Sequence, residues 1–462
     1  MQRAAVETDA RERGNWALPP GPSGYQLLTM GRLQAEPLVY IDELWKQYGD
    51  LIRLPVMPGF NVVIAIHPEA MEHVLSTHSE RYGKADFFLN AMGAVQGKGL
   101  FTSEGDFWRS HRRLMQPAFQ QQQIVRLHGV MLSCVRAFVR ELEETEGEVI
   151  DIAEKMTSLT LKIVSLGLFS VDVSDESDRL RSALLSAIRY VYSRVTSPLA
   201  APLWVPTRQN REFRAAKRAI DEFVLKIIRS RRENLGEQVD LLSMLLSAED
   251  EETGEGLSDV ELLNEAITLI NAGHETSATA VAWTWQLLGT HPEAMARMYS
   301  EVDSVLQGGE PSLEKLPQLQ YARRVFDESL RLCPPGMGLA PRVAGEDDEI
   351  QGCFIPKGSI INLSTYYTLR HPDFWENPER FDPDRFLPER AALRPKYTYI
   401  PWGAGPHVCI GKNFALMEVM MVLSAIVQRF EVELVSKQPV EIDPRFTLRP
   451  KDGVKVVLKR RN

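Results

Sequence analysis

"PWGAGPHVCIG", residues 401–411, surrounds Cys409 with three glycines and two prolines. Glycine permits backbone conformations that other residues avoid, and it lets a chain approach a flat ligand closely. Residues 410–430 have the pattern of a helix, so the thiol is expected at or just before a helix N-terminus, where backbone N–H groups favour a thiolate. A stabilised thiolate can act as a nucleophile, a redox group or a metal ligand, and His407 is close enough in sequence to act as a base.

The other three cysteines suggest no site of their own. Cys134, Cys333 and Cys353 are scattered along a chain of 462 residues that has no C-x-x-C pair. This spacing argues against a disulfide framework and against a cysteine-rich zinc or iron–sulfur site. We expect these three side chains to be small buried residues.

The overall composition is that of a globular protein. Hydrophobic residues make up 44% and charged residues 25% of the chain, which is enough apolar material for a sizeable core. The formal net charge of −9 argues against a nucleic-acid partner. Residues 1–18 lack the apolar core of a signal peptide, and no run approaches the ~18 apolar residues that span a bilayer. We therefore predict a cytoplasmic, monomeric protein without a membrane anchor.

Helical patterns dominate the middle of the chain. The clearest covers 258–289, where Ser258 and Glu261 form a capping box, and Gly289 and His291–Pro292 mark the end. A helix of this length would be roughly 48 Å long. Its second half is apolar on nearly every side, which predicts a path through the middle of the protein.

Short β patterns flank the helical region. Residues 49–56 and 60–66 predict one hairpin, and 352–364 predict a second that turns at the sequence PKG. The segments FEVELV and VKVVLKR predict two more strands near the C-terminus. The predicted fold class is therefore mainly α with small β-sheets (α+β), with a polar, proline-rich segment over 1–24 and a single domain over 25–462.

The cysteine loop is similar to the haem-binding loop of the cytochrome P450 family, whose usual pattern is F-x-x-G-x-R-x-C-x-G. Gly405, Cys409 and Gly411 match this pattern. Trp402 stands where phenylalanine is usual, and His407 stands where arginine is usual. In the family that arginine pairs with a haem propionate. A histidine there could donate a hydrogen bond, but its charge would depend on pH.

Further motifs extend the resemblance. ESLR places Glu328 and Arg331 three residues apart on one helix face. In the family this pair binds the arginine of a downstream P-E-R-F segment and braces the haem loop. The PERF at 378–381 makes Arg380 the expected third member of this triad. A buried triad is costly to break by removing one partner, so we expect a structural role.

The segment AGHET, which starts at Ala272, resembles the oxygen-activation motif of the family. Ala272 and Thr276 share one face of the long helix, while Gly273 removes bulk and allows the helix to loosen. The resemblance implies that Thr276 takes part in oxygen activation and that Glu275 connects the site to protons in solvent. His274 lies off this face and is expected to pack or to be solvated.

Two arginine motifs complete the expected cofactor site. WRSHR resembles the W-x-x-x-R of the family, so Trp108 and Arg112 would contact a haem propionate. Arg342, in the segment PRVA, is a further expected propionate partner. The expected cofactor-binding residues are Trp108, Arg112, Ala272, Gly273, Arg342, Trp402, Gly403, His407, Cys409 and Gly411, with Cys409 also as the metal ligand.

The resemblance covers nearly the whole chain and implies haem b (iron protoporphyrin IX) with the Cys409 thiolate as its proximal ligand. It implies a monooxygenase that uses O2 to hydroxylate or epoxidise a lipophilic substrate, such as a fatty acid, a terpenoid or a steroid-like molecule. No flavin, nicotinamide or ferredoxin-like motif is present, so electrons are expected from separate partners, such as a ferredoxin and its reductase. Arg109, Arg113 and Lys412 are candidates for docking an acidic donor. The lack of an anchor resembles the soluble bacterial members of the family.

The substrate itself is not specified by the sequence. By position, the segment DFFLNAMGAV lies where family members line the pocket. No conspicuous charged clamp is present, although Arg53 or Lys84 could hold a carboxylate. The apolar residues that could line the pocket, or equally be ordinary core, are Phe87, Phe88, Leu89, Met92, Ile267, Met337, Leu339 and Phe446.

Three alternatives from other classes stay open at this point. A haem-thiolate peroxygenase or rearranging enzyme that does not use O2 would usually lack the Glu275–Thr276 pair. A non-catalytic haem protein, such as an electron carrier, would fill both axial positions, whereas the Ala–Gly opening favours leaving one empty. A cysteine hydrolase that pairs Cys409 with His407 would leave ESLR, PERF and AGHET unexplained.

Overall fold

The computed structural model describes residues 17–25, 30–171, 177–196, 201–233, 240–249, 254–444 and 447–461. Contacts within the chain divide it into two compact units. Unit 1 holds the residues up to Phe88 together with Met337–Pro378 and Arg394–Val408, and unit 2 holds Leu89–Gly336, Glu379–Leu393 and the residues from Cys409 onward. Most elements are helices and the sheets are small, so the predicted α+β fold class is confirmed.

Unit 1 is built on a five-stranded sheet. Its first two strands, β1 (Leu51–Met57) and β2 (Phe60–Ala65), form the predicted antiparallel hairpin. β8 (Ile360–Leu363) runs parallel to β2, and two short strands, β5 (Arg342–Ala344) and β3 (Tyr82–Lys84), complete the order β1-β2-β8-β5-β3.

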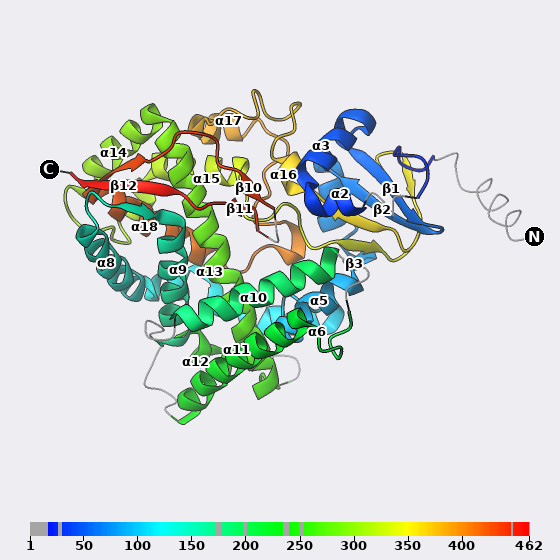
Figure 1. Cartoon of the computed structure of the whole chain (residues 1–462), viewed down its shortest axis with the longest axis horizontal. Helices are drawn as coiled ribbons and strands as arrows, with labels where there is room; N and C mark the ends of the chain where they lie inside the picture. The colour runs from blue at the N-terminus through cyan, green and yellow to red at the C-terminus, as the bar shows by residue number, and fades with distance from the viewer. Residues whose placement is uncertain are drawn as a thin grey trace, which may run out of the picture. The chain divides into compact units, whose positions relative to one another are not determined.

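Helix α3 (Pro37–Tyr48) packs on the hairpin of unit 1 (Figure 1). A proline at its start suits the first turn of a helix, where the missing N–H has no partner to lose. Tyr40, Ile41 and Leu44 are spaced so that they share one face, and they are buried in one cluster with side chains of β1 and β2. Leu33 of the short helix α2 (Met30–Ala35) packs against this cluster, whereas Ala70 and Met71 of α4 (Pro68–Glu72) belong to a second apolar cluster of unit 1.

The second predicted hairpin is wrong in its pairing. Residues 352–364 contain two strands, β7 (Cys353–Ile355) and β8, but β7 pairs with β6 (Asp348–Ile350), and β8 pairs with β2 and β5. The turn between β6 and β7 consists of Gln351 and Gly352, which have φ of 51° and 74°. Two consecutive residues with positive φ match the twist of a tight hairpin, so this shorter turn forms the hairpin instead.

Unit 2 is organised around α13 (Asp259–Thr290), the predicted long helix. The capping box is present, because the Ser258 hydroxyl accepts from the Glu261 N–H and the Glu261 carboxylate accepts from the Ser258 N–H. The helix continues through Gly289, where a Cβ would meet the Leu434 side chain at 2.4 Å. Most residues between Leu262 and Leu288 are buried, as their apolar character predicts.

Helix α9 (Ile152–Phe169) lies alongside α13 (Figure 1). The helices approach closely at Gly273, where a Cβ would lie 2.9 Å from Cγ2 of Val164. The Thr160 hydroxyl of α9 donates to the carbonyl of His274 at 2.8 Å. Gly273 is therefore explained by helix packing, and the expected loosening of α13 at this point is not seen, because the helix is continuous.

Further helices surround this pair in unit 2, and a three-stranded sheet closes it. The predicted C-terminal strands β9 (Phe430–Leu434) and β12 (Lys455–Arg460) are confirmed and pair antiparallel, with β4 (Val149–Asp151) on the other side of β12. The helices used below are α6 (Gly105–Met115), α10 (Ser177–Thr196), α11 (Arg208–Glu233), α14 (Pro292–Leu306), α15 (Gln320–Leu332) and α18 (Lys412–Arg429). Among the described residues, no helix combines the length and the apolarity that a bilayer crossing requires.

Candidate active site

The part of the cysteine loop that belongs to unit 1 is fixed by its glycines. Gly403 and Gly405 have φ of 72° and 66°, a region that favours glycine. A Cβ on Gly405 would lie 1.8 Å from the backbone oxygen of Leu75, in the short helix η2 (His73–Thr77). Gly405 is therefore required because the loop packs directly against the backbone of η2. After this contact the chain forms the single turn η7 (Gly405–His407).

Cys409 begins the part of the loop that belongs to unit 2. Gly411 is the N-cap residue of α18, so the thiol stands just before the N-terminus of that helix, as predicted, and the backbone N–H groups of Gly411 and Lys412 bond to it. The residue is exposed to solvent, yet enough protein atoms surround the sulfur to raise the pKa of the Cys409 thiol by desolvation. The helix N–H groups and the charges of Arg112 and Lys412 oppose that rise. The other thiols, Cys134 and Cys333, are buried as expected, and Cys353 is half-buried.

Helix α6 presents the two residues of the predicted W-x-x-x-R motif. Trp108 is buried and Arg112 is half-buried. Burial lowers the pKa of Arg112, and the negative charge of a Cys409 thiolate acts in the opposite direction. The Arg112 guanidinium is therefore within electrostatic range of the sulfur, as a shared ligand site would require.

A buried histidine that the sequence reasoning missed holds α6 on α13. Nδ1 of His111 lies 2.6 Å from Oε1 of Glu265, and its Nε2 lies 3.4 Å from Oε1 of Glu261. The same Glu265 oxygen accepts from the N–H of Leu100 at 2.8 Å. Because His111 and Glu265 are both buried, these bonds fix the rotation of α6 and hence the direction of Arg112. Its position inside the WRSHR motif was the available signal.

Ala272 and Thr276 interrupt the burial of α13. Both are exposed, four residues apart on one face, although their helical neighbours Glu275 and Ser277 are buried. The Thr276 hydroxyl donates to the Ala272 carbonyl at 2.7 Å. These two exposed residues are called the notch of α13 below, whereas Gly273 faces α9 and does not belong to the notch.

Glu275 lies beside a separate cavity. It is buried and accepts a hydrogen bond of 2.6 Å from the Thr447 hydroxyl. The cavity has a volume of about 230 Å³ and is lined by Leu185, Ile188, Arg189, Tyr192, Glu275 and Arg449. His274, which precedes Glu275 in the sequence, was expected either to pack or to be solvated. It is packed, and its Nδ1 lies 2.9 Å from the Ile270 carbonyl oxygen. Burial lowers the pKa of His274, which keeps the ring neutral.

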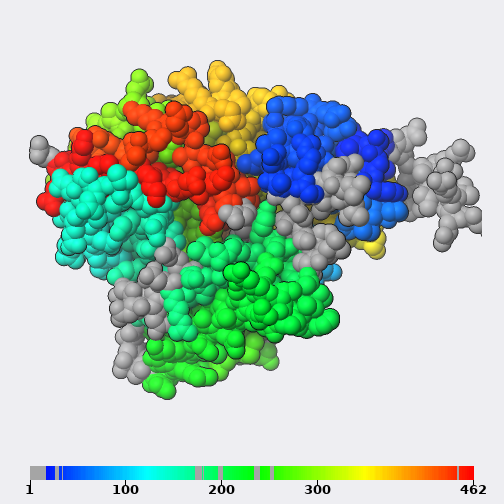
Figure 2. Space-filling model, viewed as in Figure 1, coloured from blue at the N-terminus to red at the C-terminus, as the bar shows by residue number. Residues whose placement is uncertain are grey.

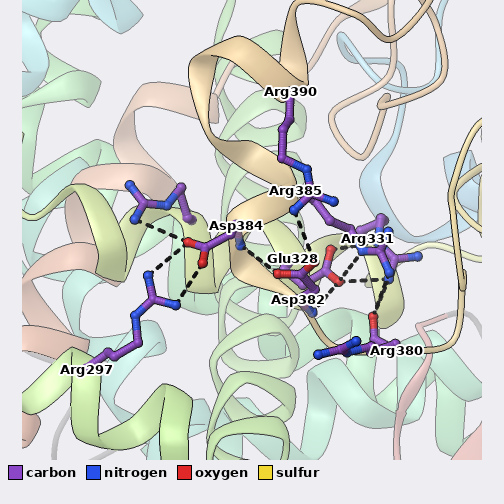
Figure 3. Close-up of polar contacts among 9 residues, drawn as sticks. Arg297, Glu328, Arg331, Arg380, Asp382, Asp384, Arg385 and Arg390 are labelled. Carbon is purple, nitrogen blue, oxygen red and sulfur yellow. Dashed lines mark hydrogen bonds and ion pairs between the residues drawn. The ribbon is translucent and has the colours of Figure 1, made fainter.

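The predicted ion-pair triad is present in unit 2, but its third member is corrected. Arg331 donates from Nε and Nη2 to the two carboxylate oxygens of Glu328 at 2.6 and 2.8 Å, and both side chains are fully buried (Figure 3). The third guanidinium is that of Arg385, whose Nε lies 3.3 Å from Glu328. Arg380 is exposed and contributes only its backbone oxygen, 3.2 Å from Nη2 of Arg331. The sequence carries a second P-x-R-F at 383–386, which was the missed signal.

A second layer of ion pairs holds Arg385 in place (Figure 3). The short helix η6 (Pro383–Phe386) carries Asp384, which accepts two bonds from Arg297 of α14 at 2.8 and 3.0 Å. Arg324 of α15 lies 3.5 Å from the same carboxylate. These hydrogen bonds and charges lower the pKa of Asp384. Because η6 is tied to two helices, the neighbouring Arg385 side chain reaches Glu328 without freedom to turn away.

Unit 1 places the predicted Arg342 opposite a second buried cation. In the antiparallel pair of β3 with β5, Lys84 lies directly across from Arg342, and both are buried. Like charges in this register destabilise a sheet unless anionic groups lie nearby. Trp402 is half-buried, and its Nε1 has no acceptor among the described residues. These donors are suited to carboxylates, and a haem brings two propionates, so the residues fit the implied cofactor.

The predicted substrate residues fall into different surroundings. On α5 (Asp86–Gln96), Phe88 and Met92 are buried, Leu89 is half-buried and Phe87 is 40% exposed. Ile267 of α13 is fully buried. Met337 and Leu339 pack against the two apolar clusters of unit 1. Phe446 lies outside the described residues. Core packing is therefore observed for several of these side chains, and their contact with a substrate stays a prediction.

Comparisons with known proteins agree over nearly the whole chain. The family model described as Cytochrome P450 matches residues 18–457. The chain is 34% identical to cyclooctat-9-en-7-ol 5-monooxygenase of Streptomyces melanosporofaciens, over 91% of this chain and 90% of that protein. It is 31% identical to pentalenene oxygenase of Streptomyces avermitilis, also over 91% and 90%. The crystal structure of the cytochrome P450DA heme domain is similar with a TM-score of 0.88 and 29% identity, covering 97% of this chain and 98% of that one. This chain belongs to the cytochrome P450 family: it is a haem b monooxygenase.

Proposed function

We propose that this monooxygenase oxidises a terpenoid substrate, with Cys409 as the thiolate ligand of its haem. The observation that carries the ligand assignment is the position of Cys409 at the N-terminus of α18, with its sulfur within electrostatic range of Arg112. The relatives support the substrate class, because their names describe oxygenation of cyclooctat-9-en-7-ol and of pentalenene. Among the substrates considered from sequence, this favours a terpenoid over a fatty acid or a steroid.

The chemistry of the reaction comes from the bound cofactor, and the protein controls access, protons and orientation. A thiolate ligand donates electron density that favours O–O cleavage over simple O2 storage. We assign Cys409 to this ligand role, because its sulfur stands at a helix N-terminus, where the N–H groups and the charge of Arg112 favour the thiolate against the desolvation that raises its pKa. Gly411 leaves space at the sulfur, since a Cβ there would lie 4.0 Å from Sγ.

We assign the propionate contacts unit by unit. In unit 2, Arg112 supplies a guanidinium and Trp108 shields it as a buried neighbour on the same helix. In unit 1, Arg342 supplies a buried guanidinium, and His407 is the counterpart of the family arginine. Trp402 adds an N–H donor that has no acceptor among the described residues.

Thr276 and Glu275 are assigned to proton supply. The Thr276 hydroxyl lies in the exposed notch of α13 and can exchange its bond to the Ala272 carbonyl for another acceptor. The adjacent Glu275 reaches the cavity that contains Arg189 and Arg449. A carboxylate that lines a cavity can take a proton from water there, and the two neighbouring side chains, Glu275 and Thr276, can carry it to the notch.

Electrons reach the enzyme from a separate donor, which we propose to be a ferredoxin with its reductase. Lys412, at the first turn of α18, is exposed and three residues from Cys409. Arg113 is half-buried, and Arg109 is exposed but already paired with Asp106. Lys412 is therefore the strongest of the three docking candidates for an acidic partner.

The test has two steps on the purified holoenzyme. The absorption spectrum of the dithionite-reduced protein with carbon monoxide should show a Soret band far to the red, as a cysteinate ligand requires. A band at the usual position for histidine-bound haem would contradict the Cys409 assignment. Cyclic terpenes and terpene alcohols are then titrated beside palmitic acid and a steroid. We expect a spin-state shift with the terpenoids, and a shift with palmitic acid alone would contradict the substrate class.

A further inference from the structure

Four polar residues form a stripe along one face of α13. Asn264, Thr268, Asn271 and Glu275 are separated by four, three and four residues, and this spacing keeps them on one side of a helix. The positions between them are mostly apolar, and most of this part of the helix is buried. Buried polar groups are normally hydrogen-bonded, so each member of the polar stripe needs a partner.

The two ends of the polar stripe find their partners within the chain. Asn264 donates from Nδ2 to the carbonyl of Lys98 at 3.2 Å. The loop comes so close here that a Cβ on Gly97 would lie 2.0 Å from Oδ1 of Asn264. At the other end, Glu275 accepts from the Thr447 hydroxyl at 2.6 Å. The chain therefore satisfies the first and the last member of the stripe.

The two middle members are not satisfied in this way. Thr268 is only 5% exposed, and its hydroxyl has no hydrogen-bond partner among the residues that the structure describes. Thr276 and Thr284 of the same helix each donate to the carbonyl four residues earlier, at 2.7 and 2.8 Å. The side-chain oxygen of Asn271 is shielded from solvent and equally lacks a described partner. A buried hydroxyl or amide without a partner is costly, so this pair is suited to a polar ligand.

We propose that Thr268 and Asn271 bind a hydroxyl group that the substrate already carries, so that this enzyme oxidises a terpene alcohol. The inference rests on the proposed terpenoid class and narrows it. Side chains three residues apart on a helix are neighbours, with Cβ atoms about 5–6 Å apart, so one oxygen atom can reach both. An alcohol accepts from the Thr268 hydroxyl and donates to the Asn271 oxygen, which gives both groups a partner. A hydrocarbon of the same shape leaves both unpaired and is therefore disfavoured.

The position of the pair suits contact with a substrate. A helix rises about 1.5 Å per residue, so Thr268 lies about 6 Å along the axis from Ala272, the first residue of the notch. The cavity of about 230 Å³ begins at Glu275, one turn beyond Asn271, and side chains of α10 form part of its wall. Figure 2 shows α10 and α11, in green, at the surface of unit 2, and α11 packs against α13. The bound hydroxyl is thus held several carbon atoms away from the carbon that is oxidised at the notch.

This assignment also places the enzyme in a reaction sequence. Its substrate must have gained an oxygen atom before it binds. A cyclisation that ends with the capture of water, or an earlier oxygenation, is the class of reaction that supplies such a terpene alcohol. The product then carries two oxygen functions, separated by the distance between the stripe and the notch.

Titration of the purified holoenzyme, followed by the spin-state shift of the haem, tests the proposal. Cedrol and patchoulol are compared with the hydrocarbons cedrene and patchoulene. The tighter of the two alcohols should bind at least about tenfold more tightly than its hydrocarbon. Thr268→Val and Asn271→Leu should each reduce this preference to about threefold or less, whereas Thr268→Ser retains the hydroxyl and should keep it. Thr284→Val is the matched control, because that hydroxyl already has a partner in the same helix.

The outcomes separate this inference from the proposed function. Equal affinities for alcohol and hydrocarbon in the wild type would overturn the inference and leave the terpenoid class intact. An undiminished preference in both Thr268→Val and Asn271→Leu would also overturn it, because the hydroxyl would then be recognised elsewhere. No spin-state shift with any of the four compounds would overturn the terpenoid class and this inference together. The carbon monoxide spectrum of each variant verifies that its haem site is intact.

Discussion

Arg385 shows how a single residue completes a buried ion-pair network in unit 2. Its guanidinium is buried beside the fully buried Glu328–Arg331 pair, while the Arg380 side chain points to solvent. Arg385→Ala leaves a buried carboxylate only partly compensated and should cost about 3–5 kcal/mol of unfolding free energy. Arg380→Ala is the matched control and should stay within about 0.5 kcal/mol, because its backbone oxygen remains. Urea unfolding and haem content measure both, and equal losses in the two variants would contradict the corrected triad.

A substitution of Thr276 tests the proposed route of proton supply. Thr276→Ala should reduce product formed per NAD(P)H several-fold, with the lost electrons released as hydrogen peroxide. Thr284→Ala is the control, because Thr284 makes the same bond to the carbonyl four residues earlier, at 2.8 Å, but is buried on α13. Coupling should be unchanged in the control. If Thr276→Ala still forms one product per NAD(P)H consumed, Thr276 has no role in proton supply.

Glu418 predicts how stability depends on pH. It is fully buried on α18, and this burial raises its pKa to about 8, although the Ser277 side chain opposes the rise. Between the ordinary pKa of 4.5 and 8, the folded state binds more protons than the unfolded state, so stability falls as pH rises through this window. Glu418→Gln should remove that loss, gaining at most about 5 kcal/mol above pH 8 and nothing below pH 4. Unfolding free energies across this range measure the difference, and parallel curves would contradict a raised pKa.

At the scale of elements, the contact between α9 and α13 depends on Gly273. Gly273→Ala brings a Cβ to 2.9 Å from Val164 and should cost about 1–3 kcal/mol through overpacking. Val164→Ala removes the obstructing methyl groups, so the double variant should lose about 1 kcal/mol less than the sum of the single losses. A double-mutant cycle of thermal or urea unfolding measures this coupling. Additive losses would show that the helices can move apart at this point.

Several elements could be predicted from sequence because their determinants are local. The capping box of Ser258 and Glu261 and the β1–β2 hairpin were predicted and are confirmed. The predicted pairing of β7 was wrong. The hairpin turns at Gln351 and Gly352, which both have positive φ, and not at the later PKG segment. Strand pairing between distant segments, such as β2 with β8, leaves no comparable local signal.

At the scale of the whole molecule, the cofactor is part of the stability of the fold. A ligand that binds only the folded chain stabilises it by mass action. We expect the haem-free protein to unfold at a lower temperature than the holoenzyme, and reconstitution with haemin to restore the higher midpoint. Differential scanning calorimetry of the two forms measures the shift. Equal midpoints would mean that haem contributes nothing to folding stability, contrary to the tight binding expected of this family.

The sequence by itself determined the family and the mainly helical fold class, and it singled out Cys409 as the expected haem ligand. Each of these depends on short motifs with fixed spacing, such as the residues around Cys409 and the i, i+4 pair Ala272 and Thr276. Helix periodicity and helix caps depend on interactions between residues a few positions apart, so a short stretch of sequence is enough to predict them.

Only the tertiary structure decided which arginine completes the triad, why Gly405 and Gly273 must lack a side chain, and which residue holds α6 on α13. Two P-x-R-F segments lie within nine residues, and burial against Glu328 is what separates Arg385 from Arg380. A Cβ on Gly405 would clash with the backbone of Leu75, and a Cβ on Gly273 would press against the Val164 side chain. Each of these neighbours lies more than a hundred residues away along the chain. Burial, ion pairing and close packing are properties of neighbours in space, so no local pattern can specify them.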